Sequence, residues 1–425
     1  MVPDTSEPVT DQPAPIALSH PAAGIPEVSG TAAEIGSAAA LLAGGHGPFA
    51  VDAERASGFR YSNRAYLIQV RRAGAGTVLI DPVADGGDPV TVLRPLAQVL
   101  GEDEWILHAA DQDLPCLAEL GMRPPALYDT ELAGRLAGFD RVNLAAMVQR
   151  LLGLGLTKGH GAADWSKRPL PAAWLNYAAL DVEVLIELRQ AIAGVLGEQG
   201  KADWAAQEFG YLREVAATAA TAPTRRDRWR RTSGIHKVRD RRGLAAVREL
   251  WVVRDQIAQH RDIAPGRILP DSAIIAAALA NPGTVAELIE LPVFGGPRQR
   301  RNARTWLAAL TAARDNPDAP EVTEPYSGPP PPARWAKRKP EAAARLEAAR
   351  AALTELSERV SVPTENLVAP DLIRRLCWDW DPATASATAV EEFLRAGGAR
   401  SWQQDLVVPV LAVSLSELGT PQLGS

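Results

Sequence analysis

The chain has 425 residues, which is too long for one ordinary hydrophobic core and predicts about three domains. Its formal net charge of −6 excludes a general polyanion-binding protein, so any nucleic-acid site has to be local. Two cysteines, Cys116 and Cys377, cannot build a zinc site or a disulfide framework, and we expect unpaired thiols in a reducing compartment.

The first 30 residues are rich in Pro, Ser, Thr and Ala and poor in aromatic side chains. Such a composition cannot bury enough apolar surface to offset the entropy lost on ordering, so it predicts a disordered tail over residues 1–30. The stretch lacks the basic region and apolar core of a secretory signal. Since no run reaches the ~18–20 apolar residues of a membrane helix, we expect a cytoplasmic protein with no membrane partner.

An α/β domain is predicted over the next part of the chain, residues 31–205. Apolar and β-branched residues between turn signals predict strands at 48–54 (PFAVDAE), 64–72, 77–82 and 105–110. The first three strands are so close in sequence that they are most simply antiparallel neighbours. Helical spacing dominates the remainder, so the sheet should be mixed and packed against helices.

The rest of the chain divides into four segments, two of which have a helical pattern. These are a basic linker (206–242), a first helical region (243–320), a Pro-rich spacer (321–340) and a second helical region (341–420). The Pro-rich spacer must be extended, and we expect few contacts between the last region and the remainder of the protein.

The two helical regions show a weak internal repeat. Ile263 matches Val362, and Ile268 matches Leu367, each at an offset of 99 residues (362 − 263 and 367 − 268). In both copies a helix ends in a short turn with a proline, and an apolar pair and then Pro and Asp follow. The interpretation is a duplicated helical domain, and a chance match is the alternative.

Two carboxylates end the first predicted strand. Asp52 and Glu54 are two residues apart, so their side chains project from the same face of the strand. Adjacent carboxylates are costly unless a partner compensates them, and a divalent cation is the usual partner. Taken alone, the pattern also fits a solvated surface.

Two further positions carry acids that could join this pair. Asp113 follows a buried strand and opens a helix, where it could equally be a simple helix cap. Tyr177 and Asp181 are four residues apart on a predicted helix, so they share a face, although an amphipathic helix with a solvated Asp is the plain alternative. His108, at the end of the same buried strand, is expected to be packed or hydrogen-bonded and not a metal ligand.

The order of these elements is more specific than any one of them. The series FAVDAE…YLIQV, ILHAADQDL and NYAALDV resembles the DEDD exonuclease superfamily, in the subgroup whose last motif is Y-x-x-x-D. The segments LYDTELAGRL (127–136) and KGHGAADWSKRPL (158–170) are similar to ribonuclease D in particular. The resemblance covers residues from about 45 to 420. It implies a ribonuclease H-like mixed-sheet catalytic domain followed by two all-α domains of the type shared by helicases and ribonuclease D (HRDC), the second of them divergent.

The resemblance also implies a chemistry. Asp52, Glu54, Asp113 and Asp181 would bind two divalent ions, Mg²⁺ or Mn²⁺, and Tyr177 would position the attacking water. The expected activity is that of a 3′→5′ exoribonuclease, which releases nucleoside 5′-monophosphates from RNA with a single-stranded 3′ end. Transfer-RNA 3′ maturation, with precursor tRNAs as substrates, is the expectation for the family.

RNA upstream of the 3′ end is expected to contact the helical domains and the basic linker. The candidate residues in the linker are Arg225, Arg226, Arg228, Arg230, Arg231 and Lys237. A solvated linker helix is the alternative for this run. Trp229 could stack on a base or pack internally.

Two other functions share parts of this pattern. A proofreading-type DNA 3′→5′ exonuclease would use the same carboxylates, and a non-catalytic RNA-binding scaffold would keep the fold alone. The chain also departs from the ribonuclease D pattern after Lys158, where Gly159 and His160 replace the usual Ser or Thr and Glu. This loop is expected to flank the substrate and to affect nucleotide preference, with the chemistry unchanged.

Overall fold

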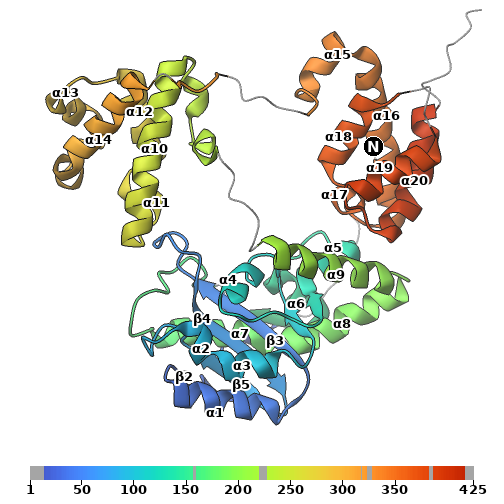
Figure 1. Ribbon diagram of the computed structural model, residues 1–425. Helices are drawn as coiled ribbons and strands as arrows, with labels where there is room; N and C mark the ends of the chain where they lie inside the picture. Colours follow the sequence, from blue (N-terminus) through green and yellow to red (C-terminus); the bar gives the residue numbers. More distant parts are fainter. Residues whose placement is uncertain are drawn as a thin grey trace, which may run out of the picture.

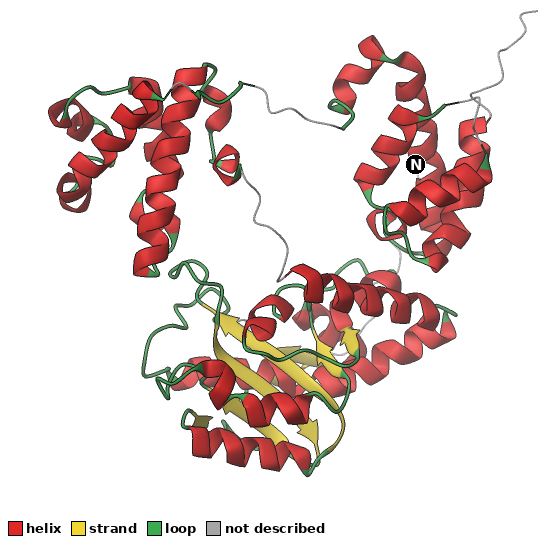
Figure 2. Ribbon diagram, in the orientation of Figure 1, coloured by secondary structure: helices red, strands yellow, loops and turns green. Residues whose placement is uncertain are grey.

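The structure, a computed structural model, describes residues 14–156, 159–219, 227–316, 318–322, 328–381 and 386–416. An α/β domain forms the base of the molecule, and two helical domains rise from the same side of it (Figure 1). Within the described residues, strands occur only in the α/β domain (Figure 2). The predicted order of one mixed-sheet domain and two helical domains is therefore confirmed.

The main sheet has six strands in the order β2-β5-β4-β3-β6-β7. Their bounds are β2 (Val28–Ser29), β3 (His46–Arg55), β4 (Ala65–Ala73), β5 (Gly76–Ile80), β6 (Trp105–Leu107) and β7 (Leu127–Asp129). Strand β4 is antiparallel to β3 and β5, whereas β6 and β7 run parallel to β3 and to each other. Strand β3 thus lies near the centre of the sheet, and Phe49, Ala50 and Val51 on it are fully buried.

Helices cover the sheet and complete the α/β domain. They are α1 (Ala32–Ala43), α2 (Pro89–Val92), α3 (Arg94–Leu100), α4 (Leu114–Glu119), α5 (Thr130–Leu136), α6 (Leu144–Leu152), α7 (Ala172–Glu183), α8 (Leu185–Glu198) and α9 (Ala202–Ala219). Thr31 and Glu34 form a capping box that fixes the start of α1. Helix α7 packs across β3, β4 and β5 and so brings its side chains to the middle of the sheet.

The N-terminal segment is more ordered than its composition predicts. Residues 16–18 form a short strand, β1 (Ile16–Leu18), parallel to β8 (Leu154–Leu156). Strand β2 joins the edge of the main sheet, where Val28 pairs with Leu79. The predicted tail over residues 1–30 is therefore wrong from residue 14 onward, because main-chain pairing orders a segment that has little apolar surface of its own. Residues 1–13 lie outside the described part of the chain.

The first helical domain has its own core. Its helices are α10 (Arg241–Arg261), α11 (Pro265–Ile268), α12 (Asp271–Ala280), α13 (Val285–Glu290) and α14 (Pro297–Asp315). Leu250, Phe294 and Trp306 are completely buried at its centre. Trp229, on the 3₁₀ turn η1 (Arg228–Arg231), belongs to the same core, so this part of the predicted linker is integral to the domain.

Three helices of the second helical domain repeat those of the first at a constant offset. Its helices are α15 (Trp335–Arg338), α16 (Pro340–Val360), α17 (Thr364–Leu367), α18 (Pro370–Asp379), α19 (Ala387–Ala396) and α20 (Ser401–Ser416). Helices α16, α17 and α18 begin and end 99 residues after α10, α11 and α12, the offset that aligns Ile263 with Val362 (340 − 241, 364 − 265, 370 − 271). The left-handed residue that ends the first long helix, Asp262, likewise recurs as Ser361.

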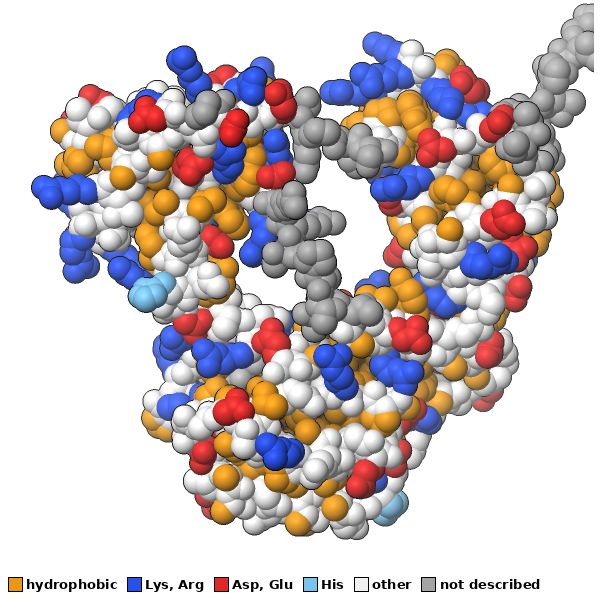
Figure 3. Space-filling view, in the orientation of Figure 1, with side chains coloured by type: hydrophobic (Ala, Val, Ile, Leu, Met, Phe, Trp, Pro, Cys, Tyr) orange, Lys and Arg blue, Asp and Glu red, His pale blue; other side chains and the backbone are white. Residues whose placement is uncertain are grey.

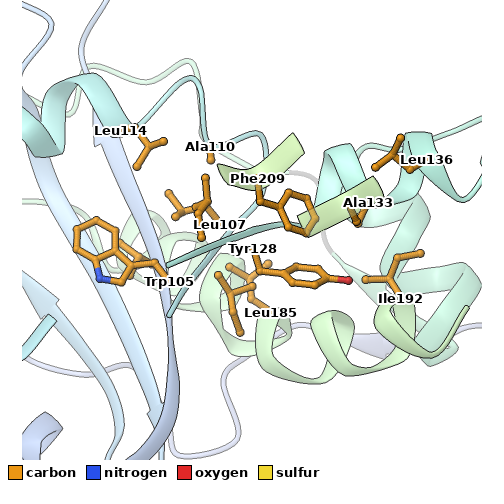
Figure 4. Close-up of a cluster of buried hydrophobic side chains, with 14 of the residues drawn as sticks. Trp105, Leu107, Ala110, Leu114, Tyr128, Ala133, Leu136, Leu185, Ile192 and Phe209 are labelled. Atoms are coloured by element: carbon orange, nitrogen blue, oxygen red, sulfur yellow. The ribbon is translucent and has the colours of Figure 1, made fainter. Parts of the chain in front are cut away.

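The expectation of few contacts between the second helical domain and the rest is wrong. Its core is continuous with the core of the α/β domain, through helix α9. Helix α9 starts before residue 206, where the linker was predicted to begin, and Phe209 on it packs on Tyr128 of β7 with ring centroids 4.6 Å apart (Figure 4). The predicted spacer also contributes Trp335, which is fully buried. Sequence composition indicated an exposed connection, but these interfaces depend on tertiary packing.

The two cysteines of the chain are free thiols, as expected. Cys116 and Cys377 are both buried and unpaired. No described helix combines the length and apolar character needed to cross a bilayer.

Candidate active site

The carboxylate pair lies at the end of the central strand. Asp52 and Glu54 project from one face of β3, where they pair in register with Gln69 and Leu67 of β4. A register shift follows Glu54 and bends the strand before Arg55. The bend leaves both carboxylates at the point where the strand leaves the sheet, and Glu54 is almost completely buried.

Helix α7 supplies the third acid. Ligand oxygens of Asp52, Glu54 and Asp181 all lie within 4.8 Å of one another, although 127 residues separate Glu54 from Asp181 (181 − 54). Tyr177 lies one turn before Asp181 on α7, and burial together with the negative charge of Asp181 raises the pKa of its phenol, so the shared helix face predicted for this pair is confirmed.

The fourth acid lies beside this group. Asp113 begins α4 and is only 5% exposed, but its side chain makes no capping hydrogen bond. Its carboxylate instead faces Arg55, with Nη2 of Arg55 3.7 Å from Oδ1. The cap interpretation is therefore excluded for its side chain, and Arg55 is a cation of the site that sequence reasoning missed. Arg55 directly follows Glu54 in the sequence, and this position next to the Asp52–Glu54 pair was the available signal.

Burial and mutual repulsion make these acids unusually basic. Burial, followed by the negative charges of Asp52, Asp181 and Asp113, raises the pKa of Glu54 to about 10. Burial raises the pKa of Asp52 to about 6, and burial with the charge of Asp52 raises the pKa of Asp113 and Asp181 well above the usual range. Arg55 opposes these shifts at Asp52, Glu54 and Asp113 but does not cancel them.

Such a cluster fits a divalent cation. Its donors are all carboxylate oxygens, which hard cations such as Mg²⁺ and Mn²⁺ prefer over softer metals. A bound cation would replace the mutual repulsion of the acids by attraction. The donor set and the raised pKa values together support divalent-metal binding at this site.

Glycine 159 touches the tyrosine of the site. A Cβ atom built at Gly159 would lie 1.7 Å from Cδ2 of Tyr177, so only glycine lets the loop pass this close to the ring. The His160 ring meets the Tyr177 ring edge-on, with centroids 6.2 Å apart. Gly159 and His160 replace the residues usual in ribonuclease D, and their loop was expected to flank the substrate. Their contacts with Tyr177 place this loop next to the candidate active site as well. Lys158 lies outside the described residues.

Other predicted residues have structural partners. His108 Nδ1 lies 2.9 Å from the Thr130 hydroxyl, which confirms it as a hydrogen-bonded residue. Trp229 is 3% exposed, so packing prevails over base stacking. The guanidinium groups of Arg228 and Arg230 lie over the rings of Trp251 and Trp229.

Two of the remaining candidates for RNA contact have exposed side chains. These are Arg231 and Lys237, whereas Arg225 and Arg226 lie outside the described residues.

A cavity of about 300 Å³ opens beside Glu54. Its wall includes Arg55, at the end of β3, and Ser57 and Gly58, from the loop that joins β3 to β4. The other side of this loop is held by the first helical domain: Arg267 Nε donates to the Gly58 carbonyl at 2.8 Å, and Ala264 N donates to the Phe59 carbonyl at 3.0 Å. The first helical domain therefore holds the loop that forms part of the cavity wall.

Family models match three successive parts of the chain. They describe a 3′-5′ exonuclease over residues 30–196, an HRDC domain over residues 243–310 and a 3′ to 5′ exonuclease C-terminal domain over residues 328–415. Ribonuclease D from Acidiphilium cryptum is 32% identical over 278 residues, which are 62% of this chain and 68% of that protein. The chain belongs to the ribonuclease D family.

Another relative and two solved structures are also similar to the chain. Ribonuclease D from Gluconacetobacter diazotrophicus is 34% identical over 259 residues, and the match spans 59% of this chain and 63% of the length of that relative. A protein from Bifidobacterium adolescentis has a crystal structure that is 36% identical, with a TM-score of 0.85 over 94% of this chain and 99% of that one. The fold of Escherichia coli RNase D is also similar, with a TM-score of 0.66 at 22% identity over 92% and 99% of the two chains.

Proposed function

We propose that the protein is a metal-dependent 3′→5′ exoribonuclease that releases nucleoside 5′-monophosphates from RNA. The observation that supports this most directly is the convergence of Asp52, Glu54 and Asp181 beside Tyr177, with Asp113 and Arg55 next to them. Membership of the ribonuclease D family supports the same reaction. The active-site set is proposed to be Asp52, Glu54, Asp113, Tyr177 and Asp181.

The mechanism assigns a role to each side chain. Asp52, Glu54, Asp113 and Asp181 would bind two divalent ions, Mg²⁺ or Mn²⁺. When bound, these ions would lower the pKa of the attacking water and neutralise charge on the leaving 3′-oxygen. Burial and the negative charge of Asp181 raise the pKa of Tyr177 well above its usual value, so the phenol stays neutral and can hold the water through its hydroxyl.

The proposed substrate is RNA with a single-stranded 3′ end, with precursor tRNA as the natural example. Base pairing hides the edges of the bases and the scissile link, so a free end has to enter the site. The cavity beside Glu54 is proposed to receive the terminal nucleotide. Arg231 and Lys237, together with Arg225, Arg226, Arg228 and Arg230, are proposed to contact the RNA upstream. The constant offset of 99 residues supports the second helical domain as a divergent HRDC-like copy.

Digestion of a precursor tRNA with a 3′ trailer tests the proposal. We expect stepwise loss of single nucleotides as 5′-monophosphates, with Mg²⁺ or Mn²⁺ required and with no loss by an Asp52→Ala variant. Matched RNA and DNA oligonucleotides separate the exoribonuclease from a proofreading-type DNA exonuclease. If wild type with either metal leaves the RNA intact, the proposal fails: digestion of the DNA oligonucleotide would then favour the DNA exonuclease, and intact DNA would leave the binding scaffold.

A further inference from the structure

Strand β4 carries a buried glutamine that no part of the proposed mechanism uses. Figure 3 shows Lys, Arg, Asp and Glu side chains spread over the visible face of the molecule, where water solvates them. Gln69, in contrast, is 0% exposed, and neither its Nε2 nor its Oε1 has a hydrogen-bond partner among the residues that the structure describes. A buried amide without partners costs free energy, so its presence needs a reason.

Other buried glutamines of the chain are fully bonded. Gln299 donates from Nε2 to the Ile268 carbonyl at 2.7 Å, and its Oε1 accepts from the Trp306 indole at 2.9 Å. Gln403 likewise uses both ends of its amide. Within the described part of the chain, Gln69 is the one side chain with two buried polar atoms that lack partners. An apolar side chain of similar shape would fill the same space without this cost, so packing does not account for an amide here.

The register of the sheet places Gln69 opposite a carboxylate of the candidate active site. Strands β3 and β4 are antiparallel, and Asp52 is the residue directly across from Gln69. Side chains of directly opposed residues project from the same face of a sheet, with Cβ atoms ~4.5–5.5 Å apart. The longer glutamine side chain can therefore bring its amide to the Asp52 carboxylate.

Helix α7 covers Gln69 from above the sheet. The neighbours of Gln69 on the same face of β4 are Leu67 and Arg71. Leu67 belongs to one buried cluster with Ala178 of α7, and Nε of Arg71 lies 3.8 Å from Oε2 of Glu183 on the same helix. The stretch of α7 between these two contacts includes the acid that this helix supplies to the site. The amide is thus enclosed between carboxylates of β3 and α7.

We propose that Gln69 is a positioning residue of the metal site, whose Nε2 donates a hydrogen bond to the Asp52 carboxylate when a divalent cation is bound. Groups that bond to metal ligands fix the orientation of those ligands and strengthen metal binding. A neutral amide can do this without adding charge to the site, and its Oε1 remains able to accept from a water molecule. The inference rests on the metal-dependent enzyme proposed above and adds a residue that orients one of its ligands.

The test compares the same substitution at two buried glutamines of the full-length protein. Gln69→Met keeps an unbranched side chain of similar length and removes both polar atoms. Gln299→Met, the matched control, makes this change in the core of the first helical domain, where both polar atoms have partners. Isothermal titration calorimetry measures the affinity of each protein for Mn²⁺ without RNA, and calorimetric scans in chelator measure the melting temperature.

We expect Gln69→Met to bind Mn²⁺ about 10–100-fold more weakly than wild type. Its melting temperature in chelator should equal or exceed that of wild type, because the substitution removes an unpaired buried amide. Gln299→Met should show the opposite pattern, with wild-type affinity for Mn²⁺ and a lower melting temperature, since it leaves two buried groups without partners. In RNA digestion, Gln69→Met should need correspondingly more Mn²⁺ but should approach the wild-type kcat when Mn²⁺ is saturating.

Wild-type affinity of Gln69→Met for Mn²⁺ would overturn the proposal and leave Gln69 as a residue that only fills the core. Weaker Mn²⁺ binding that is accompanied by a fall in melting temperature as large as that of Gln299→Met would also overturn it, because Gln69 would then be supporting the metal-free fold. The exoribonuclease proposal fails separately if wild type binds Mn²⁺ but leaves RNA intact, because the Mn²⁺ titration contains no RNA.

Discussion

Glu54 is the residue whose proton affinity reports most directly on the metal site. Its pKa is raised from 4.5 to about 10, and that of Asp52 from 3.8 to about 6. Between pH ~4.5 and ~10 the metal-free folded protein thus binds more protons than the unfolded chain, so its unfolding free energy falls as pH rises through this window. Metal binding displaces these protons and should restore the stability.

The gain in melting temperature from Mn²⁺ over chelator should therefore be larger at about pH 8.5 than at about pH 5.5. Differential scanning calorimetry at the two pH values measures it. The matched variant Asp52→Asn, Asp181→Asn should be more stable than wild type in chelator, because repulsion is relieved, and should gain little from Mn²⁺. An equal response of wild type and variant to Mn²⁺ would show that these residues do not share a metal.

Substitution of the same carboxylates should affect catalysis and RNA binding to different extents. Asp52→Ala or Asp181→Asn should lower kcat on a single-stranded RNA by on the order of 10²–10³ or more, since each removes a donor that acts on the reacting phosphate. The dissociation constant for RNA should change little, because other surfaces hold the strand. Single-turnover digestion and anisotropy give the two quantities. Turnover near the wild-type rate in either variant contradicts the assigned roles.

Gly159 offers a test of Tyr177 that leaves Tyr177 in place. A methyl group at position 159 would overlap the Tyr177 ring, whereas one at Gly161 would meet the Tyr177 hydroxyl at an ordinary 3.4 Å. We expect Gly159→Ala to displace the ring and to lower kcat roughly tenfold or more, with KM nearly unchanged. Gly161→Ala is the matched control. Equal kinetics of the two variants would show that the loop yields and the ring does not move.

At the scale of elements, α9 is the helix on which the second helical domain docks. Glu208 of α9 is 6% exposed and accepts two hydrogen bonds from Arg400, at 2.7 and 2.8 Å, and one from the Trp402 indole. The Trp402 ring also stacks on Trp204, with centroids 5.0 Å apart. A buried ion pair that loses one partner leaves a charge without compensation.

Arg400→Ala should therefore lower the free energy of unfolding by about 3 kcal/mol. Arg395→Ala, which breaks an exposed pair with Glu391 on α19, should cost ~0–1 kcal/mol. Urea titrations followed by circular dichroism compare the two. A loss from Arg400→Ala no larger than that from Arg395→Ala would mean that the docked interface contributes little to stability.

Elements with strong local signals could be predicted from sequence. The apolar runs of β3 and β4 and the helical spacing of Tyr177 and Asp181 arise from neighbouring residues. The offset of 99 between α10 and α16 can be read from two similar stretches of sequence. Strands β1 and β2 are only three and two residues long, too short for any periodicity, and they form because β8 and β5 offer free edges. The contact of Gly159 with Tyr177 depends on how a loop folds back, which no local pattern encodes.

For the whole molecule, the decisive feature is that the second helical domain shares a core with the α/β domain. The buried Lys201 at the start of this contact donates from Nζ to the carbonyls of Leu136 in α5 and Ser361 after α16, at 2.8 and 3.2 Å. The sequence predicted a separable last domain, because a Pro-rich stretch indicates exposure of the connection and says nothing about where the following helices dock.

A chain ending at residue 322 should for this reason be destabilised and not merely weaker in substrate binding. It would expose two aromatic side chains of α9. These are Trp204, which stacks on Trp402, and Tyr211, which lies beside Gly398. We expect a melting temperature lower by several degrees, raised binding of a hydrophobic dye, and loss of kcat on a short single strand as well as on a tailed hairpin. An unchanged melting temperature with a rise in KM alone would support an independent last domain.

Helix α9 also closes the polypeptide on itself. The chain leaves the α/β domain from this helix, forms the first helical domain, and returns to the same helix through Trp402 and Arg400. The first helical domain is thus tethered to the α/β domain at both of its ends. The two tethers limit its distance from the candidate active site, so it needs no large interface of its own with the α/β domain. Docking of the last domain is intramolecular and benefits from a high effective concentration. One cut between the helical domains would turn the protein into a two-chain complex that dissociates on dilution.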